Sequence, residues 1–150
     1  MAIIDKNKIK KPYINDRDED VFIGLKLPLQ RGDIGDGQFA STLTTLDAVK
    51  QNLRNLLNTE MGERVMQPNL GVRLKRFLFE PYSDDLVAGV KTSVIDSLGY
   101  WMPFVQVNNI NVKMADNQAG DFRSTLVVSI DFSLKKDPTS IESVQVTVGE

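Results

Sequence analysis

The chain has 150 residues, of which 41% are hydrophobic and 25% are charged, values that suit one folded soluble domain with a core of its own. Its formal net charge of −2 gives no support for nucleic-acid binding, which uses a basic face. The absence of cysteine and histidine excludes disulfides, cysteine-ligated zinc, and Ser-His-Asp or Cys-His catalysis.

No apolar run approaches the roughly 20 residues of a membrane-spanning helix, and the N-terminal residues lack the apolar core of a secretion signal. We therefore expect a protein that is made and used in a cytoplasm and that has no membrane partner.

Residues 1–20 are polar and divided by charge, with lysines first and then the acidic run Asp16–Asp20, which only Arg17 opposes. Such a segment buries little apolar surface, so it is either a solvated arm or an arm that becomes ordered on a partner. We predict a flexible N-terminal arm over 1–20 and a single domain over 21–150.

A strand is predicted over 21–27, where Pro28 ends it. The following glycines, at 32, 35 and 37, predict a mobile loop. Their spacing resembles a phosphate-binding loop only superficially, because no Gly-Lys-Ser/Thr follows and no helix begins there. We predict no nucleotide and no other cofactor.

Three helices are predicted in the middle of the chain. The first begins near Thr44, which forms a capping pair with Asp47, and continues as an apolar stripe until about residue 58. A short amphipathic helix over 70–78 is stopped by Pro81. The third begins after Ser83 as the N-cap and ends at Gly99 as the C-cap.

The C-terminal third is predicted to be β-structure. A strand over 105–114 changes phase at Asn108-Asn109, which indicates a bulge, and a long alternating strand follows over 122–134. Asp137-Pro138 is expected to break this strand, and a last strand covers 141–148. The predicted fold class is α+β, with about three helices on one face of a small, mostly antiparallel sheet.

Carboxylates are the main candidates for catalysis, and they are Glu60, Glu63, Glu80, Asp84 and Asp85. A glycosidase needs two carboxyl groups across one sugar bond, and no such pair stands in a recognisable context here. We interpret these residues as solvated charges or structural ion pairs. No D-x-D-x-D-G calcium loop is present, and no metal site is predicted.

The segment from Leu56 to Gly71 contains Gly62-Glu63-Arg64-Val65-Met66-Gln67-Pro68, and Leu78-Phe79-Glu80-Pro81 follows it. It resembles the signature of the baseplate wedge protein that initiates sheath assembly in contractile-tailed phages. It is also similar to TssE, a baseplate subunit of type VI secretion. The resemblance covers about residues 40–148, and Gly24–Leu29 also resembles the phage branch.

This resemblance implies a structural protein without enzymatic activity, built like the linking domain of the sheath protein. It implies a place in the tail baseplate of the virion, after assembly in the host cytoplasm. The implied partners are the tail sheath protein, other baseplate wedge proteins and nearby tail tube proteins. The implied function is to join wedge proteins at the tail tube and to template the first sheath ring.

Strand addition is the physical route that we expect, because an open sheet edge can accept an arm from the next protein. We place that surface on strands 122–134 and 141–148, and the alternative is that both strands are paired internally. The expected partner-binding residues there are Thr125, Val127, Ser129, Val144 and Val146.

Two further groups of partner-binding residues follow from the resemblance. Glu63, Arg64 and Pro68 match the family motif, and they either fix the turn between helices or meet a partner. Family members often carry Glu-Pro-Arg where this chain has Met102, Pro103 and Phe104. Only the proline is kept, so an apolar contact that includes Trp101 would replace a charged one.

Two other functions remain open at this stage. Some members of the family have been described as lysozyme-like, which makes a baseplate glycoside hydrolase the first alternative. A soluble regulator that uses the same fold to bind a protein is the second, because a fold does not determine a function.

Overall fold

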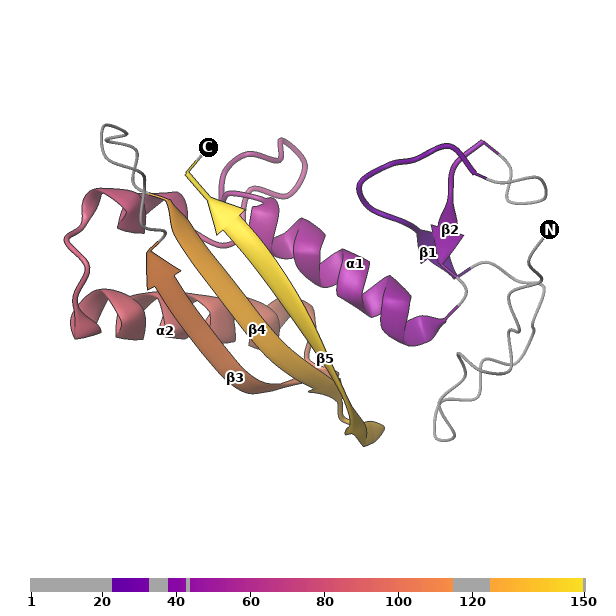
Figure 1. Cartoon of the computed structure of the whole chain (residues 1–150). Coiled ribbons are helices and arrows are strands. Elements are labelled where there is room, and N and C mark those ends of the chain that lie inside the picture. The colour runs from indigo at the N-terminus through magenta and orange to yellow at the C-terminus, as the bar shows by residue number, and fades with distance from the viewer. Residues whose placement is uncertain (1–22, 33–37, 43, 115–124, 150) are drawn as a thin grey trace. The chain divides into compact units, whose positions relative to one another are not determined.

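The computed structural model describes residues 23–32, 38–42, 44–114 and 125–149 (Figure 1). Internal contacts divide the chain into two compact units, residues 1–52 and 53–150. The arm predicted over 1–20 lies outside the described residues, and the single domain over 21–150 stays a prediction.

In the first unit, two short strands pair in antiparallel fashion, β1 (Gly24–Leu25) and β2 (Ser41–Thr42). The amide of Lys26 donates to the carbonyl of Ala40 at 2.9 Å and extends this pairing. The predicted strand over 21–27 is therefore shorter than expected in its described part, and its partner β2 was not predicted. Most of the predicted glycine loop lies in 33–37, outside the described residues.

Helix α1 (Thr45–Asn58) begins where the sequence predicts. The amide of Asp47 donates to Oγ1 of Thr44 at 3.2 Å, and this hydroxyl donates to Oδ2 of Asp47 at 2.7 Å, which confirms the capping pair. The apolar stripe of the helix is buried, as expected for core positions, at Leu46, Val49, Leu53, Leu56 and Leu57.

The predicted α-helix over 70–78 is instead the 3-10 helix η2 (Lys75–Phe79). The described residues thus hold two α-helices rather than three. The reason is that the loop before η2 closes only at Val72, whose amide donates to the carbonyl of Thr59 at 2.9 Å. Residues 70–72 therefore belong to the end of this loop, where Gly71 has φ +124°, outside the helical region, and Pro81 ends the segment after η2.

Helix α2 (Asp84–Trp101) is capped at its start by Ser83, whose Oγ accepts the amide of Leu86 at 3.2 Å, as predicted. Its end differs from the prediction. The helix runs through Gly99 to Trp101, and the amide of the C-cap Met102 donates to the carbonyl of Leu98 at 2.8 Å. Gly99 does not adopt the positive φ of a C-capping glycine.

Three antiparallel strands form the main sheet in the order β3-β4-β5, namely β3 (Val105–Met114), β4 (Leu126–Leu134) and β5 (Asp137–Val148). A register shift between Val107 and Asn109 confirms the predicted bulge. Strand β5 begins at Asp137 rather than at residue 141. A short turn joins β5 to β4. Pro138 is tolerated inside β5 because, near the start of an outer strand, its missing backbone N–H takes no hydrogen bond away from the sheet.

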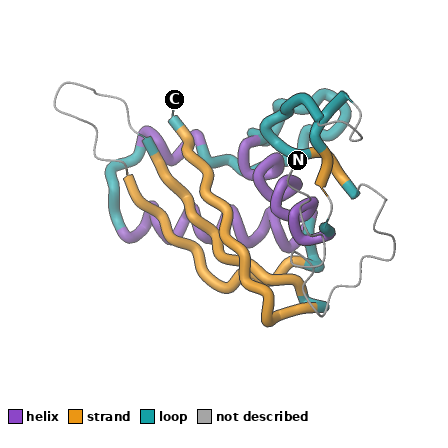
Figure 2. The backbone as a smooth tube through the Cα atoms, turned by 45° about the vertical axis from the view of Figure 1, so that its right-hand side comes forward, coloured by secondary structure: helices purple, strands orange, loops and turns teal. Residues whose placement is uncertain are grey.

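Figures 1 and 2 show α2 lying across one face of this sheet, and the apolar side chains of the strands are buried on that face. The opposite face is polar and arranged in rows across the strands. One row is Asn109, Asp131 and Ser143, and the next is Asn111, Ser129 and Gln145. The mixed helix and sheet architecture with antiparallel strands is therefore confirmed.

Candidate partner-binding site

The segment that carries the sequence motif is a closed loop over residues 59–72, between α1 and η2; we call it the 59–72 loop. Its two ends are joined where the amide of Val72 donates to the carbonyl of Thr59 at 2.9 Å. Its middle is joined where the amide of Gly62 donates to the carbonyl of Pro68 at 2.7 Å. Loops of this size with adjacent ends are compact surface units rather than open connections.

At the tip of the loop the chain reverses in a tight turn. The amide of Gln67 donates to the carbonyl of Arg64 at 3.2 Å, a hydrogen bond between residues three apart. Val65 and Met66 are the two central residues of this turn. They point to solvent almost completely, with exposed fractions of 95% and 91%.

Two glycines make the loop geometry possible. Gly62 has φ +93° and Gly71 has φ +124°, both in the region that L-residues with side chains avoid. A Cβ on Gly71 would lie 2.3 Å from the carbonyl oxygen of Thr59, so only a glycine allows this close approach. The carbonyl of Gly71 also accepts a hydrogen bond from Oγ of Ser97 at 3.2 Å, which ties the loop to α2.

The predicted residues Glu63, Arg64 and Pro68 all lie in the 59–72 loop, and the side chain of Arg64 reaches out of it to α1. Oε2 of Glu63 accepts the amide of Glu60 at 3.0 Å, and the amide of Glu63 donates to the carbonyl of Glu60 at 3.1 Å. Nη2 of Arg64 donates to Oδ1 of Asn55 at 3.2 Å. Of the two roles that the sequence left open, these bonds support shaping the turn, and a direct partner contact stays a prediction.

The sequence analysis did not single out Val65 and Met66 as exposed apolar residues that could meet a partner. A signal was present, because the central positions of turns usually hold Gly, Pro, Asn, Asp or Ser. A β-branched residue followed by methionine at these positions is a local conflict, and such conflicts are expected at functional sites.

The second predicted group lies where α2 ends. Trp101 is half-buried and packs edge-on against Tyr100, with ring centroids 5.0 Å apart and an interplanar angle of 83°. Met102 is buried, so its side chain belongs to the core rather than to the apolar contact that we expected. Pro103 and Phe104 are exposed, as is Tyr100, and these three remain accessible to a partner.

The third predicted group lies on the sheet, and one expectation about it is wrong. Strand β4 is paired with β3 on one side and β5 on the other, so it offers no open edge. Thr125, Val127 and Ser129 are half-buried and follow the alternation of the polar sheet face. Val144 and Val146 are buried in the core, so only their backbone is left for a partner.

Strands β3 and β5 are the outer strands of this sheet, and within the described residues neither has a strand on its outer side. The two edges differ. The bulge after Val107 interrupts β3, whereas β5 keeps a continuous register with β4 from Glu142 to Val148. A regular edge is the better template for another strand, because a bulge disrupts the ladder locally.

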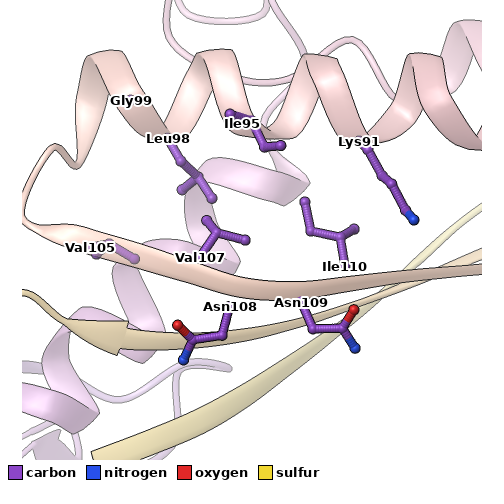
Figure 3. Close-up of a pocket in the computed structure, with 9 residues that line it drawn as sticks. All are labelled: Lys91, Ile95, Leu98, Gly99, Val105, Val107, Asn108, Asn109 and Ile110. Atoms are coloured by element: carbon purple, nitrogen blue, oxygen red, sulfur yellow. The ribbon is translucent and has the colours of Figure 1, made fainter. Parts of the chain in front are cut away.

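A groove of about 410 Å³ lies between α2 and β3. Figure 3 shows Ile95 and Leu98 of α2 directed toward Val107 and Ile110 of β3, with Lys91 at one end. Ile95 is half exposed, so the groove can accept an apolar group from outside. Its lining among the described residues supplies apolar packing, two side-chain amides and one positive charge, and none of these lining residues carries a carboxylate.

Asp137, at the start of β5, is a buried carboxyl group whose pKa is displaced. Hydrogen bonds from Ser140 and then Thr139 lower the pKa of Asp137 below its ordinary value, and Oγ1 of Thr139 donates to Oδ1 at 2.7 Å. The side chain is only 1% exposed. This arrangement stabilises the hairpin between β4 and β5 and lies far along the chain from the 59–72 loop.

The local structure accounts for three of the acidic residues considered for catalysis. Glu63 is engaged with the loop backbone, and Asp84 and Asp85 lie in the first turn of α2, where a negative charge is favourable. Across the residues that the structure describes, no group of three or more acidic side chains could hold a metal ion. In the same residues, no helix is long and apolar enough to cross a membrane.

Three solved structures share this fold. A protein described as a candidate tail lysozyme, from Geobacter sulfurreducens, has a TM-score of 0.56 and 18% identity, covering 71% of this chain and 91% of that one. A chain in the anti-feeding prophage baseplate has a TM-score of 0.53 and 20% identity over 82% of this chain and 81% of that one. A chain in the type VI secretion baseplate complex has a TM-score of 0.50 and 15% identity, covering 67% of this chain and 89% of that one.

These identities are low, so the likeness establishes the fold. A search of curated proteins finds no match. A family model supplies the sequence-level relationship, since the model described as "Baseplate wedge protein gp25" matches residues 44–139. The match begins at the N-cap of α1 and includes the whole 59–72 loop, η2, α2, β3 and β4. This chain belongs to the baseplate wedge protein gp25 family.

Proposed function

We propose that this protein joins wedge proteins in the baseplate of a contractile tail and templates the first ring of the tail sheath. The observation that carries the proposal is the regular outer edge of β5. A strand of the sheath protein that pairs with this edge would extend the sheet from the baseplate into the sheath.

The chemistry of β5 supports strand addition. Beyond its pairing with β4, the stretch of β5 from Ser143 to Val148 makes no backbone hydrogen bond to any other described segment. Its side chains alternate between exposed Ser143, Gln145 and Thr147 and buried Val144 and Val146. An added strand would gain main-chain hydrogen bonds at the edge, and this kind of recognition needs no change in the core.

We propose that the protein is not an enzyme. The family is a structural component of baseplates, and Glu63 is committed to the loop backbone. The likeness to a candidate tail lysozyme is a likeness of fold at 18% identity. A fold by itself does not supply a catalytic pair, so we do not propose a hydrolase.

The proposed location is the baseplate of a virion or of a related contractile particle, after assembly in the host cytoplasm. Relatives in fold come from an anti-feeding prophage baseplate and a type VI secretion baseplate. The proposed partners are wedge proteins and the sheath protein, with the tail tube nearby.

The test is co-assembly followed by electron microscopy. Baseplates prepared without this protein are mixed with sheath protein and tail tube, and the protein is then supplied or omitted. Sheath that grows from baseplates only in the supplied sample is the expected result. Equal sheath growth in both samples would refute the template role. Release of peptidoglycan fragments by the purified protein, abolished in Glu63→Gln, would refute the non-enzymatic assignment.

A further inference from the structure

We propose that Val65 and Met66, which we call the tip pair, insert into an apolar pocket of a neighbouring wedge protein, and that a carboxylate lies at the rim of this pocket. The inference rests on the proposed function, because it names the side chains with which this protein would join a wedge. It assigns Glu63, Arg64 and Pro68 to the positioning of the tip pair.

The first argument is exposure. The side chains of the tip pair are 95% and 91% exposed, among the highest values of the large apolar residues in the described chain. The two residues are adjacent, so they form one continuous apolar projection rather than scattered apolar positions. Burying both would remove a valine and a methionine side chain from water, which is a strong driving force for association.

The second argument is that the projection is already ordered. Hydrogen bonds close the 59–72 loop at Thr59–Val72 and Gly62–Pro68, and a third closes the turn at Arg64–Gln67. The side chain of Glu63 adds a bond to the amide of Glu60. A partner that binds this loop therefore loses little conformational freedom in it, and preorganised contacts of this kind bind more tightly.

The third argument is charge. The guanidinium of Arg64, next to the tip pair, bonds to the neutral side-chain amide of Asn55. The neighbouring carboxylate of Glu63 is directed at the backbone. Arg64 directly precedes the tip pair in the turn, so its positive charge lies on the side of the turn that faces Asn55 of α1, and a carboxylate at the rim of the partner pocket would complement it.

The tip pair and the β5 edge use different chemistry. The tip pair offers side chains on a loop, whereas β5 offers backbone groups on a sheet edge. One protein can therefore hold a wedge protein and a sheath strand at the same time, which is what a joining and templating role requires.

The experiment measures the affinity of the full-length protein for purified wedge complexes that lack it. The test variant is the double substitution Val65→Ser with Met66→Ser. The matched control is Ile141→Ser, which also replaces a well exposed apolar side chain but lies in β5. We expect the double variant to lose about tenfold or more in affinity and the control to lose less than about twofold.

Two companion measurements make the test decisive. Thermal unfolding of the double variant should match that of the wild type, because the replaced side chains are exposed; a lowered midpoint would mean that they pack within this chain, and would overturn the proposal. Arg64→Ala should reduce the salt dependence of wedge binding, because it removes the charge that faces the rim carboxylate.

Unchanged wedge affinity in the double variant would also overturn the inference. If sheath growth still required the protein in that case, the proposed function would stand without the tip pair. If the wild type neither bound wedges nor supported sheath growth, both the inference and the proposed function would fail.

Discussion

The strongest test of the loop geometry is the substitution Gly71→Ala. Gly71 has φ +124°, and an added Cβ would lie 2.3 Å from the carbonyl oxygen and 2.9 Å from the carbonyl carbon of Thr59. Both atoms belong to the backbone, so no flexible side chain can move aside. The substitution must therefore open the loop at the hydrogen bond between the Val72 amide and the Thr59 carbonyl.

The magnitude follows from three contributions. Holding alanine in this backbone region costs about 1–3 kcal/mol, and losing the loop-closing hydrogen bond costs about 1 kcal/mol. The smaller conformational freedom of alanine in the unfolded chain offsets about 0.4–1 kcal/mol. The net loss in the free energy of unfolding is then about 1–3.5 kcal/mol, and for a chain of 150 residues the melting temperature should fall by about 2–14 °C.

Two other glycines serve as controls in the same assay. Gly62 has φ +93° but no atom within 4 Å of an added Cβ, so alanine there meets only the backbone penalty. Gly99 lies within α2 and also has open space around an added Cβ. Alanine at Gly99 should stabilise the protein by about 0.5–1 kcal/mol, since alanine is the better helix former.

Thermal and urea unfolding followed by circular dichroism give the three changes in stability directly. We expect Gly71→Ala to be the most destabilising, Gly62→Ala to be intermediate and Gly99→Ala to be stabilising. A cost for Gly71→Ala no larger than that for Gly62→Ala would refute the close approach of the loop ends. A destabilised Gly99→Ala variant would refute the continuation of α2 beyond residue 98.

Three further predictions concern the rest of the fold. Phe132→Ala, at a fully buried position of β4, should cost about 3–5 kcal/mol in urea unfolding because it leaves a cavity; a cost below about 1 kcal/mol would contradict the packing described. Ser83→Ala should cost about 1 kcal/mol because it removes the cap of α2, whereas Ser83→Asp should be nearly neutral. The pKa of Asp137 is lowered in the folded protein, so its contribution to stability is complete above the unfolded-state pKa of about 3.9 and is lost as the pH falls through the lower folded-state value. The melting temperature of Asp137→Asn should therefore fall less on acidification than that of the wild type.

Features that depend on neighbouring residues could be predicted well. The capping pair of Thr44 and Asp47, the cap at Ser83 and the buried stripe of α1 all follow from helical spacing. The bulge of β3 follows from a change of phase in an alternating pattern. The two caps join atoms that lie within a few residues of one another, and the stripe and the bulge are visible as the period of the pattern along the chain.

Errors arose where the backbone departs from the local preference of the sequence. The pattern over 70–78 suits an α-helix, but the loop that closes between Thr59 and Val72 holds Gly71 at φ +124°, outside the helical region. Gly99 suits a helix end, yet the bond from Met102 to Leu98 carries the helix further. Pro138 suits a strand end, yet it lies in an outer strand that needs no amide there.

The candidate site shows the same division. Sequence patterns alone identified the loop motif, the family resemblance and Glu63, Arg64 and Pro68, because residue identities and their spacing carry that information. Only the tertiary structure decided that Glu63 is turned toward its own loop and Arg64 toward α1, while Val65 and Met66 face solvent. It also decided that β4 lies between two partners and that β5 has the regular outer edge. The physical reason is that exposure and strand order depend on contacts between segments far apart in the chain, and alternation along one strand is the same at the centre of a sheet as at its edge.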